Sequence, residues 1–352
     1  PPTPATPLRD GPVFARTTPP RAQPMRALRL LAVGLSAAVL AAAPAFAQSR
    51  TQTAFDLVRL DASARTAALG GPAAFVGDDP SALFANPAFL SSEADRRAAL
   101  SYSNLLLDVN AGTATYARDV AWLGGMSLAG GVRYLSYGDF ERRTGAETEG
   151  ETLGTFGASE AAVTVAASRE VLPDLRVGLA LHGLFASLDD AGAEALAGVL
   201  GVSLAVPEQG VVLGASVHHV GAMLSSFGTE ADRLPLDVRV VASKRLRYVP
   251  LTLSVAGIDL NRFEGARSDS SLVTRTLDHL ALGGELQLGP SFAVRAGYNG
   301  RRGDDLRSGG RLDLAGVNIG AGITLRRVAV DYAFSNWGAF GGLHQFGVRT
   351  KL

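Results

Sequence analysis

The sequence predicts an all-β fold, a transmembrane antiparallel β-barrel of about fourteen strands with a short N-terminal helical hatch or plug. Apolar residues make up 47% of the 352 residues. After position 46, however, no apolar run reaches the ~20 residues that a membrane helix needs. From about residue 98 onward, side chains alternate with a period of two, as they do on the two faces of a strand. The connections between these runs alternate in length, which is typical of outer-membrane barrels.

Composition narrows the function classes. The chain has no cysteine, so it can form neither a disulfide framework nor a thiolate metal site. Its 33 basic and 33 acidic residues cancel, so no net field attracts nucleic acid. Many of the 41 glycines interrupt regular apolar segments, which disfavours long helices and favours a sheet that bends and twists.

The first 47 residues have the features of an export signal. Residues 1–24 are rich in proline, and we interpret them as an upstream or disordered leader. Residues 25–47 start at Met25, continue through an apolar stretch and end in Ala-Phe-Ala, which predicts a signal peptide cleaved between Ala47 and Gln48. The alternative is an anchoring helix, but Pro44 and the Ala-Phe-Ala end suit processing by a peptidase, and the apolar core is short for a span.

Residues 48–97 do not alternate with a period of two, and we expect them to form the hatch in or under the barrel. A short helix is predicted from Ala62 to Leu69. A second helix is predicted to start at Asp79 or Ser81 and to end at Asn86, because a residue before proline is disfavoured in the helical region.

Residues 98–352 are expected to form the barrel, with opposite faces that differ in polarity. Phe292 and Val294 share one face, for example, while Ala293 and Arg295 share the other. Strands are predicted near 98–106, 110–119, 124–137, 155–169, 173–187, 194–206, 210–221, 235–247, 249–261, 276–289, 291–302, 311–325, 327–337 and 341–352.

The connections between these strands predict the orientation. Very short ones fall around 120–123, 170–172, 207–209, 248, 290 and 326, and longer polar ones at 138–154, 222–234, 262–275 and 303–310, with 107–109 an exception. The short side of such a barrel is periplasmic. A soluble β-sandwich has no reason to keep this alternation.

Two stretches of the hatch carry a resemblance to a known family. Residues 60–71 contain Ser-Ala-Arg followed by Ala-Leu-Gly70-Gly71, and residues 78–88 contain Asp78-Asp79-Pro80 and Asn86-Pro87-Ala. This order resembles the opening of the PorV/PorQ family of FadL-like outer-membrane barrels. Further stretches at 100–104, 131–140, 234–238 and 243–246 resemble the PorQ members in particular.

The resemblance implies a role in the cell outer membrane. PorQ-like proteins belong to the type IX secretion system, where they support the attachment complex that joins secreted cargo to lipopolysaccharide. It implies a surface partner of the PorZ type and other attachment-complex components, besides contact with outer-membrane lipids, and no catalytic residue, cofactor or nucleic acid. The alternative is a FadL-like channel for hydrophobic small molecules. A soluble periplasmic β protein is a third, less favoured possibility.

Other motifs have ordinary structural interpretations. Asp78 and Asp79 could bind a cation, but turn and helix-cap chemistry is the more frequent use of such residues. Gly124-Gly125-Met126-Ser127 lacks the glycine that a nucleophile elbow requires two places after its serine.

The five histidines have no metal-binding spacing, and His218 and His219, as strand neighbours, are expected to face opposite sides. Aromatic residues near the predicted strand ends suggest interfacial girdles, although strands favour aromatics in any case. The residues concerned are Tyr102, Tyr116, Trp122, Tyr134, Tyr137, Phe140, Tyr298, Trp337 and Phe340.

Overall fold

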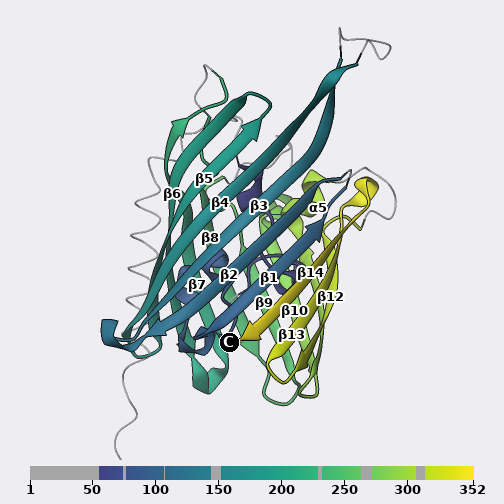
Figure 1. The fold of residues 1–352 in the computed structure, drawn as a ribbon. Coiled ribbons are helices and arrows are strands. Elements are labelled where there is room, and N and C mark those ends of the chain that lie inside the picture. The colour runs from purple at the N-terminus through teal and green to yellow at the C-terminus, as the bar shows by residue number, and fades with distance from the viewer. Residues whose placement is uncertain are drawn as a thin grey trace, which may run out of the picture.

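The computed structural model describes residues 55–73, 77–106, 108–143, 152–228, 232–262, 272–306 and 314–352. Within these residues, fourteen antiparallel strands close into one barrel in sequence order, with β1 paired to β14 (Figure 1). The predicted fold class is confirmed. The predicted leader, signal peptide and cleavage site at Ala47 and Gln48 lie outside the described residues.

The strands are β1 (Arg97–Asn104), β2 (Asn110–Val120), β3 (Met126–Arg143), β4 (Thr152–Leu172), β5 (Leu175–Leu188), β6 (Ala191–Val206), β7 (Val211–Ser225), β8 (Asp237–Arg245), β9 (Leu251–Gly257), β10 (Leu280–Leu288), β11 (Phe292–Asn299), β12 (Val317–Leu325), β13 (Val328–Asn336) and β14 (Gly342–Lys351).

The wall is apolar outside and polar inside. On β4, Val163 and Val165 are 52% and 59% exposed on the outer face, whereas Thr164 between them is 1% exposed. Arg295 on β11 and Asp331 on β13 are likewise buried on the inner face. A closed barrel removes free strand edges, and a continuous apolar exterior suits hydrocarbon. The chain is therefore an outer-membrane β-barrel.

The wall has unequal height. Strands β3 and β4 contain 18 and 21 residues, whereas β9 contains 7. Figure 1 shows β3 to β6 rising well above the β8 to β12 side. The predicted 138–154 loop is too long, because β3 and β4 continue to pair beyond a register shift between Ser136 and Asp139. These extensions lack a clean apolar alternation because they pass the membrane belt, so the sequence pattern resembles a loop.

Besides the short connection near 107–109, one exception breaks the predicted alternation of the two rims. Tight turns join β4 to β5, β10 to β11 and β12 to β13 on the rim where the chain ends, which is the periplasmic rim. The opposite, extracellular rim carries the longer connections, including α4 (Leu272–Asp278) and α5 (Gly300–Asp305). The exception is the β5–β6 connection, a tight turn at Asp189 and Asp190 on this rim.

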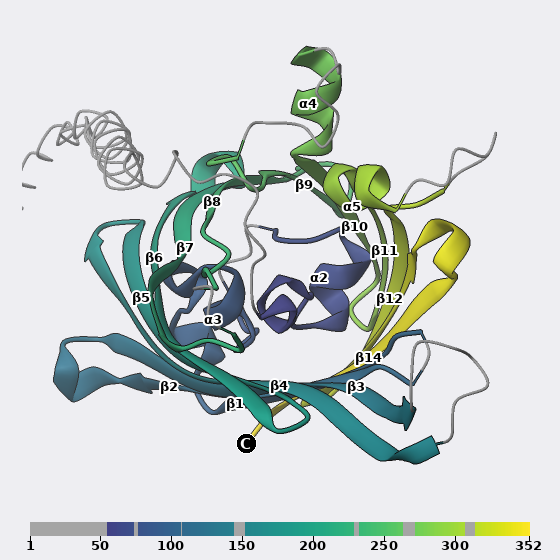
Figure 2. The same ribbon diagram turned by 90° about the horizontal axis from the view of Figure 1, so that it is seen from above.

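The hatch consists of short helical turns inside the barrel (Figure 2). They are η2 (Asp56–Arg59), α2 (Ala64–Ala68), α3 (Ala82–Ala85), η3 (Pro87–Phe89) and η4 (Ser92–Ala94). The Ser63 side chain caps α2 by accepting a hydrogen bond from the Thr66 amide, and α3 ends at Asn86, which is extended before Pro87. No helix in the described part of the chain is both long and apolar enough to cross a membrane.

Inward-facing glycines let the hatch backbone approach the wall. A Cβ on Gly178 of β5 would overlap the backbone of Pro87 and Ala88, and one on Gly297 of β11 would overlap the backbone at Leu69 and Gly70. The sequence suggested that glycine served bending of the sheet. These glycines instead provide close contact between hatch and wall.

Candidate functional site

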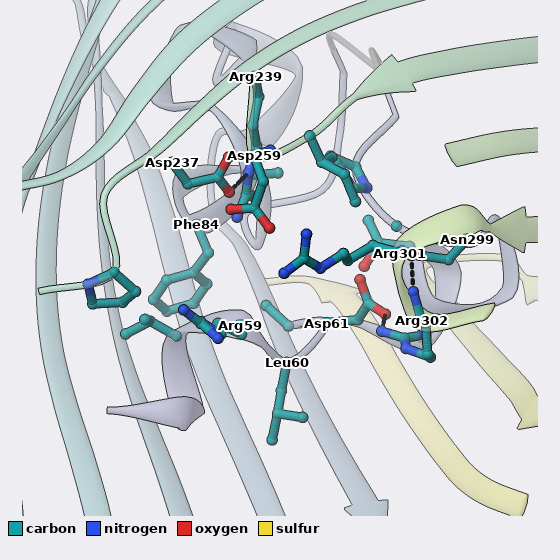
Figure 3. Close-up of a pocket in the computed structure, with 18 of the residues that line it drawn as sticks. Arg59, Leu60, Asp61, Phe84, Asp237, Arg239, Asp259, Asn299, Arg301 and Arg302 are labelled. Carbon is teal, nitrogen blue, oxygen red and sulfur yellow. Dashed lines mark hydrogen bonds and ion pairs between the residues drawn. The ribbon is translucent and has the colours of Figure 1, made fainter. Parts of the chain in front are cut away.

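A cavity of about 280 Å³ lies in the lumen, with the hatch on one side and the extracellular ends of the strands on the other (Figure 3). The hatch contributes η2, the residues after it, and α3. The wall contributes β3, β7 and β8, and the extracellular connections contribute Asp259, α5 and Trp337. Apolar lining side chains, among them Leu60, Phe84 and Ile258, lie between charged ones.

Most charges around the cavity are paired. Arg239 Nε lies 2.5 Å from Asp237 Oδ2 on β8. Arg302 Nη2 on α5 lies 3.0 Å from Asp61 Oδ2 of the hatch, and Arg301 pairs with Asp305 along α5 at 3.2 Å. Figure 3 labels Asp237 with Arg239 and Asp61 with Arg302 around the cavity. The Arg302–Asp61 pair connects an extracellular helix directly to the hatch.

Arg133 is the exception among these cations. It projects inward from β3, is 5% exposed, and Nη2 donates to the Leu60 carbonyl at 2.7 Å. Its guanidinium carbon lies 5.2 Å from the centroid of the Phe84 ring. Within the described residues, Arg133 has no carboxylate at ion-pair distance, and its Nε has no hydrogen-bond partner. A buried cation without a counter-ion favours an acceptor on a bound molecule.

Asp259 is a further acidic residue of the cavity lining, and its backbone amide donates to Asp237 Oδ1 at 2.8 Å. It lies just beyond β9 in a left-handed conformation, φ 52°, and burial raises the pKa of its carboxyl, with the nearby Asp237 raising it further. The lining contains five arginines, at 59, 133, 239, 301 and 302, against four aspartates, at 61, 237, 259 and 305.

The hatch motif holds the hatch in place. Asp79 Oδ1 accepts hydrogen bonds from the Ser81 amide at 2.9 Å and the Ser81 hydroxyl at 2.7 Å, at the start of α3. Asp78 instead pairs with Arg97 at 2.9 Å and Arg349 at 3.2 Å, and Pro80 is buried. Both carboxylates thus have partners within the protein.

The other motif residues meet the wall. Asn86 Nδ2 donates to the Val202 and Ala215 carbonyls at 3.2 and 3.3 Å, and Pro87 packs beside it against the β5–β6 wall. Gly70 and Gly71 have positive φ, 80° and 135°, and the Gly70 carbonyl accepts a hydrogen bond from Asn299 at 2.8 Å. The predicted motif residues therefore hold the hatch in place against the wall. Of these residues, only Gly71 lines the cavity.

A chain of ion pairs fastens α2 to the wall. Glu285 of β10 accepts two hydrogen bonds from Arg65, at 2.9 and 2.7 Å, and one from Arg295 at 2.6 Å. Arg295 continues to Asp331 at 2.7 Å, and Asp331 to Arg349 at 3.2 Å. Arg349 also pairs with Asp78, so the series of ion pairs leads back to the hatch.

The prediction that His218 and His219 face opposite sides is wrong. Val199 of β6 is opposed by both histidines, because the register shifts between Gly198 and Leu200. His219 adopts φ 59°, and both side chains are buried, with ring centroids 5.7 Å apart. A β-bulge of this kind turns two consecutive residues to one face. In the described part of the chain, no three His, Cys, Asp or Glu side chains are placed to hold a metal ion.

The aromatic prediction holds only in part. Tyr102, Tyr116 and Tyr134 are exposed on the outer wall, and Trp122 on the periplasmic turn, as a girdle requires. The prediction is wrong for Tyr137, because its hydroxyl donates inward to Glu160 at 2.7 Å. The prediction is also wrong for Trp337, because this residue lines the cavity.

Comparison with known proteins indicates the fold. The chain matches no protein-family model and no curated protein. The Pseudomonas putida toluene transporter TodX is 12% identical, with 85% of this chain and 98% of that chain covered and a TM-score of 0.53. A TodX deltaS2S3 mutant, described as a monoaromatic hydrocarbon channel, is 13% identical over 85% and 100%, with a TM-score of 0.57.

The monoaromatic hydrocarbon channel CymD is 13% identical over 84% of this chain and 97% of that chain, with a TM-score of 0.50. The fold is that of FadL-like outer-membrane channels. At such identities the likeness establishes the fold alone, so the narrower PorV/PorQ assignment stays a prediction. The cavity within this FadL-like fold was missed by sequence reasoning. The available signal was Arg133, a charged residue in a period-two strand between the lipid-facing Val132 and Tyr134.

Proposed function

We propose that the chain is a FadL-like outer-membrane channel for hydrophobic small molecules. The observation that carries this proposal is the lumen cavity, which is bounded by the hatch and contains a buried arginine without a counter-ion. The fold shared with the toluene transporter TodX and with CymD supports it. The alternative drawn from the sequence thus becomes the main proposal, and it requires no enzymatic activity.

The lining indicates the kind of molecule. Leu60, Phe84 and Ile258 offer apolar surface, whereas Arg133 offers a donor. Small-molecule sites combine apolar walls with a few polar groups that fix orientation. A molecule with an apolar body and one acceptor group, such as a fatty acid, matches this combination, and a small aromatic hydrocarbon matches its apolar part.

Passage to the periplasm requires the hatch to move or a path around it. Ion pairs at Arg65, Asp78 and Asp61 fasten the hatch to the wall and to α5. The state described by the structure is accordingly a closed one. Binding in the cavity and passage across the barrel are separate steps, and experiments can separate them.

Binding is tested by tryptophan fluorescence. The chain has two tryptophans, Trp122 on the periplasmic turn and Trp337 in the cavity wall. In the full chain in detergent, Trp122→Phe leaves Trp337 as the sole reporter. We expect toluene and oleate to change its emission saturably, and the companion variant Trp337→Phe to show no such change. A flat titration with both probes contradicts the proposal.

A second candidate is the attachment-complex scaffold of the type IX secretion system, with a partner of the PorZ type. It is supported by the PorQ-like hatch motif and by α4, a helix on the extracellular side whose Leu272, Val273 and Leu277 are exposed. In Figure 2 this helix projects beyond the barrel wall. If tagged protein in detergent captures no secretion component yet binds oleate, the scaffold proposal fails.

A further inference from the structure

The periplasmic rim carries an uneven distribution of charge although the chain is neutral overall. The turns from β8 round to β14, together with the strand ends beside them, contain only basic charges and no aspartate or glutamate. We call these six exposed residues the basic arc: Lys244, Arg245, Arg247, Arg326, Arg327 and Lys351. They include both lysines of the chain.

The rest of the same rim is mixed. The turns from β2 to β7 place Arg118 beside Asp119 and Arg169 beside Glu170, and Glu170 also lies 3.6 Å from Arg176. The contrast therefore lies within one rim and at one depth. This mixed half provides an internal control for the basic arc.

The charges of the basic arc are not neutralised within the part of the chain that the structure describes. None of the six forms an ion pair there. Within the described residues, Arg247 is the one member of the basic arc whose charged group makes a hydrogen bond. Its Nη2 donates to the Glu208 backbone carbonyl at 2.5 Å. Exposed cations gathered without carboxylates attract an anionic surface.

The basic arc lies where the lipid-facing belt ends. Lys244 is the periplasmic end of the outward row that begins at Val240, and it pairs across the sheet with Leu253, itself 46% exposed on the outer wall. Arg326 and Arg327 are flanked by the exposed Leu325 and Val328. A lysine at this position extends its ammonium toward the headgroups while its stem stays in hydrocarbon.

A groove at the β8–β9 turn offers a defined site within the basic arc. It measures about 400 Å³ and is lined by residues 244–249 and Gln209. Tyr248 in this turn is 96% exposed. Aromatic and basic side chains together are typical of the membrane–water interface.

We propose that the basic arc binds the phosphate headgroups of anionic phospholipids in the periplasmic leaflet, with the β8–β9 groove as the principal site. Continuity with the lipid-facing belt favours a lipid over an acidic protein, because the outward Lys244 row faces hydrocarbon along its length. This site is independent of the lumen cavity and of what the channel passes.

The test compares lipid retention in the full chain. The protein is reconstituted in vesicles of equal phosphatidylglycerol and phosphatidylethanolamine, extracted in mild detergent and analysed by native mass spectrometry for bound lipid. We expect several-fold enrichment of phosphatidylglycerol, reduced to parity by the combined change Lys244→Gln, Arg245→Gln and Arg247→Gln. The matched control Arg118→Gln with Arg169→Gln should keep the enrichment.

Equal enrichment in the groove variant and the unchanged chain overturns the proposal, as does an absence of enrichment in the unchanged chain. An acidic protein that copurifies and displaces the lipid overturns it as well. If the groove variant does not fold, the salt dependence of lipid enrichment in the unchanged chain tests the proposal instead. Its enrichment must fall at about 1 M salt, where the Debye length is ~3 Å, and a salt-independent enrichment contradicts an electrostatic site.

Discussion

The side-chain oxygen of Asn86 occupies the space that a Cβ on Gly201 would need. The same asparagine donates to two wall carbonyls and accepts a hydrogen bond from the Ala88 amide at 2.9 Å. A hatch residue thus packs against the wall strands β6 and β7 at a position where only glycine leaves room. The stability of the hatch–wall contact depends on this fit.

Gly201→Ala should destabilise the barrel by about 1–3 kcal/mol, because the added methyl overpacks a fully buried contact. The measurement is urea unfolding in detergent, followed by tryptophan emission. The control is Gly284→Ala on β10, where the nearest atom, Leu253 Cδ2, lies 3.7 Å from the new Cβ. Equal stability of the two variants would show that the hatch yields at Asn86 without cost.

Glu285→Gln should loosen the hatch, because Arg65 and Arg295 lose a shared counter-ion in a buried site. Breaking a buried pair on one side costs about 3–5 kcal/mol. Limited proteolysis should then cut the hatch faster than in the unchanged chain. Asp189→Asn, which breaks the exposed pair with Arg142, should change stability by less than about 1 kcal/mol. A Glu285→Gln hatch as resistant as the original would contradict the role of the ion-pair chain.

A double variant, Ala64→Cys with Gly347→Cys, should lock the hatch to β14. A Cβ on Gly347 would lie 3.5 Å from the Ala64 Cβ, within the range of disulfides, and the chain has no other cysteine. We expect oxidation to stop oleate uptake by proteoliposomes and a reductant to restore it. Uptake that continues in the oxidised form would mean that passage does not need α2 to leave β14. Each single cysteine variant serves as the control.

Arg133→Gln should weaken oleate binding more than toluene binding, because only the carboxylate uses the cation. A hydrogen bond to a charged group contributes about 1.5–3 kcal/mol, so the oleate Kd should rise at least about tenfold. The Trp337 signal in the Trp122→Phe background measures both ligands. Arg142→Gln, on the exposed extracellular hairpin, should alter neither. An equal loss of affinity for oleate and toluene would mean that Arg133 only supports the structure of the cavity.

Asp259→Asn should stabilise the protein at neutral pH. Burial first, and then Asp237, raises the pKa of Asp259 in the folded state. The folded protein therefore holds the proton to higher pH than the unfolded chain, and stability falls as pH rises from the ordinary aspartate value through the raised one. Asparagine removes that decline and tolerates the left-handed backbone. Urea unfolding between about pH 4 and pH 8 measures the effect, and identical profiles for both proteins would contradict it.

The barrel could be predicted from sequence because its determinants are local. Phe292 and Val294 face lipid while Ala293 and Arg295 face the lumen, and this difference recurs every two residues. The capped start of the Ala64–Ala68 helix and the end of the Ala82–Ala85 helix before Pro87 follow from capping and proline rules. These features depend on neighbours along the chain, so a single sequence contains them.

The candidate site could not be predicted in the same way. Gly201 and Asn86 are far apart in sequence, and their contact exists only once the barrel has closed around the hatch. The bulge at His218 and His219 depends on the partner strand, where Val199 opposes both. That the buried Nε of Arg133 has no hydrogen-bond partner is a property of the folded lumen.

The unequal wall has a consequence for the surrounding bilayer. At ~3.4 Å per residue and a tilt of ~40°, the 7 residues of β9 stand roughly 18 Å high and the 21 of β4 roughly 55 Å. An apolar band is ordinarily ~25 Å tall. Lipids beside β9 must therefore shorten or splay while those beside β4 need not. The resulting local thinning would favour the thin outer membrane over thicker ones, and it fixes which flank of the molecule disturbs its lipid neighbours.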